Sequence, residues 1–333
     1  MTGQETKKRH HYVPQAYLRA FCNSQGRIEV YPKDYPTKPY HAAPDKTGVE
    51  RYYYSQPTPD GDVDHNRLED MFSDLESKWQ PLVAAMHRRE DINDRLEALF
   101  EFVIAQRVRV PASRDATEAR LAAEVHQHLI DMVASGEIAR PPEPLADRMD
   151  EIIVSIDPHK SIHAMVEDIQ ASHVVFDRIG LVVLHNATGT PFLTSDNPVI
   201  WFDPTEPFDS HSPYAVKPDG EVALYFPVSP TLLVVGGVNL KERFASEGVL
   251  HGDVPDAGFV ELVNIHVARY AYRAVYASQP PEAGLVEAFA GESPVWRKDG
   301  RGGGLVFGER AVKPKWGPRE AADDELGAIP VRF

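Results

Sequence analysis

The chain has 333 residues, of which 42% are hydrophobic and 26% are charged, and its formal net charge is −15 at pH 7. This composition is typical of a globular protein with a large hydrophobic core. The net negative charge argues against a general nucleic-acid coat protein, while a local basic site stays open.

Cys22 is the only cysteine, which excludes an intrachain disulfide and a cysteine-based zinc cage and favours a cytoplasmic location. Three basic residues at positions 7–9 have no apolar segment after them, so we expect no secretory signal. The sequence has no run of about 18 apolar residues, so we also expect no membrane span. Its oligomeric state stays open.

The most distinctive stretch lies near the N-terminus. Pro14 fits the first turn of a helix, so we expect an extended segment over 9–13 that leads into a helix over 14–22. Successive side chains of an extended segment point to opposite sides. His10 and His11 are therefore predicted to face apart.

Hydrophobic periodicity predicts the remaining elements in chain order. Helices are expected over 65–87, 94–108, 113–135, 145–172 with a bend near Pro158, and 256–270. Strands are expected over 27–31, 51–55, 173–177, 179–185, 191–194, 199–202, 222–227, 232–235 and 273–277. The helix over 94–108 is nearly apolar on several sides, which indicates a central position.

These elements give a helical first half and a strand-rich second half. This pattern predicts the α+β class, with a helical N-terminal half packed against a mixed, largely antiparallel sheet in the C-terminal half. We expect one domain over 1–296, helix-rich in 1–172 and strand-rich in 173–296, followed by an irregular tail over 297–333. A domain boundary near residue 172 is the alternative.

Five stretches resemble the landmarks of DUF4238, a large and mostly bacterial family of domains of unknown function. In chain order they are HHYVPQAYLRAF at 10–21, LEDMF at 68–72 with Glu76, QRVRVP at 106–111, TSDNPV at 194–199 and FPVSP at 226–230. The resemblance covers about residues 7–280 and implies no activity. Functional hypotheses must therefore come from the chemistry of the residues.

The segment from His10 to Pro14 is also similar to the start of the HNH endonuclease motif. Carried over, His10 would be a metal ligand and His11 the general base that activates water. The later Asn and His of that motif do not follow at the expected spacing. The alternative is that both histidines anchor the N-terminal segment by hydrogen bonding and packing.

A second candidate is the turn at 194–198, where Asp196 could be a metal ligand or a general base and Asn197 a substrate contact. Its alternative is an Asx-type turn that holds two strands. The third candidate is the arginine set Arg107, Arg109 and Arg114, with Arg19. Arg107 lies at the end of a nearly apolar helix, and arginine suits phosphate or carboxylate recognition. Each arginine could instead pair with an acidic residue of the helix at 65–87.

These candidates predict a metal-dependent hydrolase, a phosphodiesterase or nuclease that acts on nucleic acid or on a phosphate-bearing small molecule. Its cofactor would be a divalent metal, Mg, Mn or Zn. The predicted catalytic residues are His11, Asp196, Arg19 and Arg107, the substrate-binding residues Gln15, Gln106, Arg109 and Asn197, and the metal ligands His10 and Asp196. The alternative is a non-catalytic protein that binds a small anion or a partner protein.

Overall fold

The computed structural model describes residues 7–152, 154, 156–214, 216–217, 219–298 and 305–309. Its α-helices are α1 (Gln15–Leu18), α2 (Arg67–Ser77), α3 (Trp79–His87), α4 (Leu96–Val108), α5 (Pro111–Ser135), α6 (Pro158–Phe176), α7 (Lys241–Glu247), α8 (Ala257–Tyr270) and α9 (Leu285–Ala288). Short 3-10 helices cover Arg19–Phe21, Pro44–Lys46, Asn93–Arg95, Leu145–Glu151, Phe208–Ser210 and Val238–Leu240.

The largest sheet has five strands in the order β12 (Leu250–Asp253), β7 (Gly180–His185), β11 (Leu232–Gly237), β10 (Ala223–Ser229) and β9 (Ile200–Phe202). Its neighbouring strands are antiparallel except for β12 and β7, which are parallel. The predicted strands over 179–185, 222–227 and 232–235 all belong to this sheet.

A second sheet joins the two ends of the chain. Its order is β3 (Tyr40–Ala42), β2 (Ile28–Pro32), β13 (Ala274–Ala277) and β8 (Thr194–Ser195), and all its pairs are antiparallel. Two-stranded pairs are formed by β1 (Arg9–His11) with β4 (Val49–Arg51), and by β5 (Gln56–Pro57) with β6 (Val63–Asp64).

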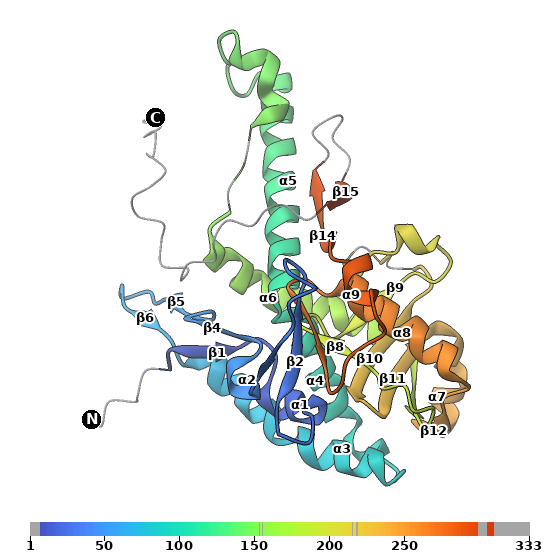
Figure 1. Ribbon diagram of the computed structural model, residues 1–333. Coiled ribbons are helices and arrows are strands. Elements are labelled where there is room, and N and C mark those ends of the chain that lie inside the picture. The colour runs from blue at the N-terminus through green and yellow to red at the C-terminus, as the bar shows by residue number, and fades with distance from the viewer. Residues whose placement is uncertain are drawn as a thin grey trace.

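The mixed α+β character is present, but the predicted layout is wrong. Strands are spread throughout the chain, and β2 pairs with β13 across more than two hundred residues. Helix α7 was not predicted and adds to α8, the predicted helix over 256–270, in the half that was expected to be strand-rich (Figure 1). The predicted strand over 173–177 is also wrong, because α6 continues as a helix to Phe176.

The predicted irregular tail begins with regular structure. Strand β14 (Glu292–Lys298) pairs antiparallel with β15 (Leu305–Glu309). The rest of that segment, 299–304 and 310–333, lies outside the described residues. The single domain over 1–296 stays a prediction.

The main core lies where α1, α3 and α4 meet the five-stranded sheet. Trp79 of α3 and Phe102 of α4 stack with ring centroids 3.8 Å apart, and Phe226 of β10 packs against both rings. Tyr17 of α1 donates its hydroxyl to the Pro227 carbonyl at 2.6 Å. Its oxygen must therefore accept the hydrogen bond from the Thr194 hydroxyl, also at 2.6 Å. These bonds fix α1 to β10 and β8.

Helices α5 and α6 complete the arrangement around the candidate site. Pro111 starts α5 at a position where a missing N–H costs nothing, and Gly136 ends it in the left-handed conformation. The C-terminal half of α5 projects away from the five-stranded and four-stranded sheets (Figure 1). Helix α6 packs against both α4 and α5.

Candidate functional site

The two histidines of β1 contact different parts of the protein. Tyr54 donates its backbone N–H to His10 Nδ1 at 2.9 Å, so the His10 proton lies on Nε2, which donates to the Lys7 carbonyl at 3.0 Å. His11 Nε2 instead lies 3.3 Å from the Asp45 carbonyl. Burial lowers the pKa of both imidazoles. The opposite orientation is confirmed, and both His10 nitrogens already have partners, which favours an anchoring role.

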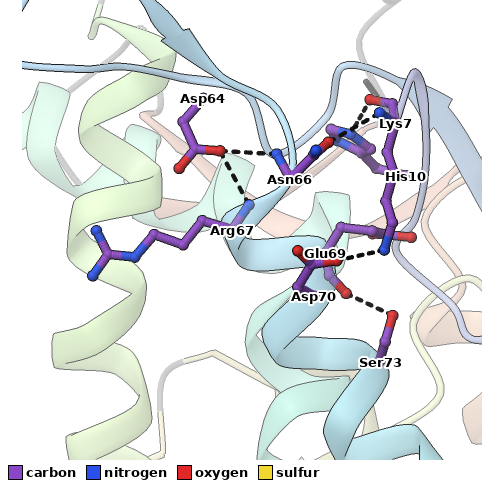
Figure 2. A network of polar contacts seen from close by, with 8 residues as sticks. All are labelled: Lys7, His10, Asp64, Asn66, Arg67, Glu69, Asp70 and Ser73. Carbon is purple, nitrogen blue, oxygen red and sulfur yellow. Dashed lines mark hydrogen bonds and ion pairs between the residues drawn. The ribbon is translucent and has the colours of Figure 1, made fainter. Parts of the chain in front are cut away.

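Residues at the start of α2 hold the N-terminal segment, as Figure 2 shows. Lys7 donates its backbone N–H to Asn66 Oδ1 at 2.9 Å and its ammonium to Asp70 Oδ1 at 2.6 Å. Asp64 Oδ1 accepts the backbone N–H groups of Asn66 and Arg67 at 2.9 and 3.1 Å. The two bonds to Asp64 satisfy N–H donors that the first turn of a helix leaves free. The two bonds from Lys7 tie the N-terminal segment to α2.

Glu69 is a titratable group that the sequence did not mark as functional. Burial raises the pKa of its carboxyl to about 7, and the negative charge of Glu76 acts in the same direction. Its Oε2 has no hydrogen-bond partner among the described residues. Arg109 donates from Nη1 to Glu76 Oε1 at 3.0 Å. Arg109 thus pairs with an acidic residue of the neighbouring helix α2, as the alternative interpretation of the arginines expected.

Asp196 lies fully buried in the turn between β8 and β9. Its Oδ1 accepts the backbone N–H of Tyr272 at 2.9 Å, and its Oδ2 accepts that of Arg273 at 2.8 Å. A longer contact of 3.4 Å joins Oδ1 to the N–H of Ala274. The carboxylate therefore holds the backbone that leads into β13, which is a structural role, but by long-range bonds and not by the local bonds of the expected Asx-type turn.

Asn197 connects this turn to the arginine at the end of α4. Its Nδ2 donates to the Tyr270 carbonyl at 3.0 Å, and its Oδ1 accepts from the Tyr214 hydroxyl at 2.8 Å. The Tyr214 ring in turn lies against the guanidinium of Arg107, 4.4 Å from ring centroid to Cζ. Asn197 thus positions Tyr214, which contacts Arg107.

The predicted catalytic residue Arg19 and the other predicted substrate contacts lie elsewhere. Arg19 is exposed at the end of α1, and Gln15 is half-buried at its start. Gln106 is buried, and with its amide oxygen toward Arg109 it accepts a hydrogen bond from Arg109 Nε at 2.9 Å. None of these four side chains is among the residues that line the cavity next to Arg107.

Arg107 is buried with an incomplete set of partners. Only 5% of the residue is exposed, and its guanidinium lies 3.8 Å from the centroid of the Trp201 ring. Nη2 donates to the Pro213 carbonyl, whereas Nη1 has no partner among the described residues. Burial lowers the pKa of Arg107 to about 10, so its side chain is still a cation at neutral pH.

A cavity of about 710 Å³ lies beside this arginine. Its walls come from the end of α4, the first half of α5, the last turns of α6, β9 and the segment around Tyr214. The lining residues are Arg107, Val108, Ser113, Ala116, Thr117, Ala119, Arg120, Asp168, Ala171, Ser172, Val174, Val175, Trp201, Tyr214 and Val216. Val174 is 55% exposed, so this part of the wall reaches the surface.

Asp168 is the acidic group of the cavity wall. The Thr117 hydroxyl donates to its Oδ2 at 2.9 Å. Burial raises the pKa of Asp168, while the positive charges of Arg120 and Arg107 act against that shift. The sequence did not point to Asp168 or Thr117, because each is one of several polar residues on a long helix and belongs to no recognisable motif.

The structure therefore separates most of the predicted site. Arg107 lines the cavity and Asn197 reaches it through Tyr214, while His10, His11 and Asp196 make their contacts in other places. Within the described residues, no three His, Cys, Asp or Glu side chains lie together so that they could hold a metal ion. The divalent metal stays a prediction. No helix in the described part of the chain is long and apolar enough to cross a membrane.

Comparison with known proteins gives one match. The family model described as "Protein of unknown function (DUF4238)" matches residues 9–280. No curated protein and no solved structure matches the chain.

Proposed function

The chain belongs to the DUF4238 family, and from that premise we propose that it binds a small organic anion in the cavity beside Arg107. This proposal takes up the non-catalytic alternative that the sequence left open. Small-ligand sites are concave, mostly apolar and carry a few placed polar groups. A cavity of about 710 Å³ has a suitable size.

The observation that carries the proposal is the unpartnered donor of Arg107. A buried donor without an acceptor costs about 1–3 kcal/mol, and more when the group is charged. Arg107 Nη1 is such a donor, on a residue that lines a cavity. An anionic acceptor from a ligand would offset that cost.

Two aromatic rings hold the guanidinium of Arg107 in one geometry. Trp201 and Tyr214 lie against the guanidinium with centroid distances of 3.8 and 4.4 Å, and cation–π contacts of this kind stabilise a buried cation. Asn197 fixes the Tyr214 hydroxyl at 2.8 Å. A positioned donor loses little conformational entropy on binding, which favours affinity.

Fluorescence of anilinonaphthalene sulfonate, a probe with an apolar body and one anionic group, tests the proposal with folded protein. We expect saturable one-to-one binding that Ala116→Trp abolishes, because Ala116 lines the cavity. Ala134→Trp, in the last turns of α5 and not among the lining residues, should leave binding unchanged. Equal binding by both variants would contradict the proposal.

The metal-dependent hydrolase is a second candidate, supported by two groups near the N-terminus. His11 Nε2 lies 3.3 Å from a carbonyl, so its Nδ1 lone pair can act as a base. Glu69, with a pKa of about 7, suits a general acid. Cleavage assays on DNA and RNA with Mg²⁺, Mn²⁺ and Zn²⁺ test this candidate, and equal activity of His11→Ala would exclude the predicted base.

A further inference from the structure

We infer that the ligand of this cavity is a monocarboxylate with an apolar alkyl or aryl body, and not a phosphate ester. This inference rests on the proposed function and names the ligand class for the same site. It follows from the number of cations at the cavity, the directions in which Arg107 can donate, and the walls around it.

Among the described residues, a single buried cation lines the cavity. The lining residues include two arginines, Arg107 and Arg120. Arg120 has a side chain that is 48% exposed and pairs with Glu124 of the same helix at 3.0 Å. Phosphate monoesters carry close to two negative charges at neutral pH and are usually bound by several cationic or N–H donors. A single buried guanidinium matches one negative charge.

The remaining donors of Arg107 lie at the edge of its guanidinium. Rings of Trp201 and Tyr214 lie against the group, and Nη2 is committed to the Pro213 carbonyl. Nη1 is left as an in-plane donor. Planar carboxylates suit in-plane donation from a guanidinium.

The negative charge of Asp168 also disfavours a ligand with two negative charges. Its carboxyl lines the same cavity and is close enough to Arg107 for the two groups to interact electrostatically. Glu167 adds negative charge and Arg120 positive charge at Asp168. Each further negative charge on a ligand would be repelled by an ionised Asp168, so a singly charged ligand is favoured.

Most of the rest of the wall is apolar and fits a hydrocarbon body. Eight lining residues have apolar side chains: Val108, Ala116, Ala119, Ala171, Val174, Val175, Trp201 and Val216. Burying apolar ligand surface against them stabilises the complex by roughly 25 cal/mol per Å² before the costs of association. The ligand therefore carries its charge at one end, against Arg107.

Calorimetric titration with naphthoate, naphthamide and naphthyl phosphate separates what the ligand's charge and its apolar body contribute to the binding free energy. The folded wild-type protein should bind naphthoate at least about tenfold more tightly than the other two. In Arg107→Met this preference should fall to within about threefold, and Arg107→Lys should keep part of it. Arg67→Met, an exposed arginine of α2, is the matched control and should keep the full preference.

Asp168→Asn gives an independent readout, because it removes the negative charge while the amide oxygen can still accept from Thr117. The affinity of Asp168→Asn for naphthoate should rise severalfold, whereas Asp74→Asn on α2 should not change it.

Tighter binding of naphthyl phosphate than of naphthoate, or an unchanged preference in Arg107→Met, would overturn the inference. If anilinonaphthalene sulfonate binds in the cavity and naphthoate does not, only the carboxylate class fails. If the sulfonate probe does not bind there, the proposed function fails too.

Discussion

Replacing Asp196 by alanine tests whether this residue is structural. The substitution leaves two buried backbone donors, the N–H groups of Tyr272 and Arg273, without their acceptors at 2.9 and 2.8 Å. A hydrogen bond to a charged group contributes about 1.5–3 kcal/mol to stability. Two such bonds predict that Asp196→Ala lowers the free energy of unfolding by about 3–6 kcal/mol. The third, longer contact to Ala274 is left out of this sum because it is 3.4 Å.

Urea denaturation followed by circular dichroism measures the change directly. The midpoint should fall while the slope of the transition stays constant, because the surface exposed on unfolding is unchanged. Asp74→Ala, an exposed aspartate on α2, is the matched control and should change stability by less than about 0.5 kcal/mol. A loss below about 1 kcal/mol for Asp196→Ala would refute the structural role and return Asp196 to the candidates for catalysis.

Three further substitutions test the polar interior. Glu69 has a raised pKa of about 7 in the folded protein, against 4.5 ordinarily, so wild-type stability falls as pH rises through that window. Glu69→Gln should therefore be more stable than wild type by ~1–2 kcal/mol at pH 8, allowing for partial exposure, and this gain should vanish near pH 4.5 in urea titrations. Burial lowers the pKa of His266 to about 4 from 6.5, so its contribution is present above pH 6.5 and is lost as pH falls toward 4. Wild type should lose ~2 kcal/mol more than His266→Gln between pH 7.5 and 5, and parallel pH profiles would contradict this. Tyr17→Phe removes the hydroxyl that joins Pro227 and Thr194, and should cost about 1–3 kcal/mol in the same assay; a cost near zero would show that these bonds do not hold α1.

Local sequence patterns correctly predicted the features that depend only on the residues of one segment. The alternation of side-chain direction in the extended segment at 9–13 predicted that His10 and His11 face apart. The apolar run of α4 predicted its buried position in the core. The valines at 174 and 175 favoured a strand, yet they lie on a helix that packs against α4 and α5. Tertiary packing overrode their β propensity.

Long-range pairing could not be predicted in the same way. Strand β2 pairs with β13 across more than two hundred residues, and neither segment alone predicts its partner. Arg107 could be picked out as a polar group at the end of an apolar helix. Its partners Trp201 and Tyr214 come from about a hundred residues further on, and Asp168 is one of several polar residues on its helix. The cavity is therefore a property of the assembled fold.

A crystal structure with iodobenzoate, whose iodine gives an anomalous signal, tests the central claim most directly. We predict one strong iodine peak among Ala119, Val174 and Val175, with the carboxylate of the ligand within hydrogen-bonding distance of Arg107. An empty cavity at saturating ligand, or a carboxylate that points away from Arg107, would contradict it.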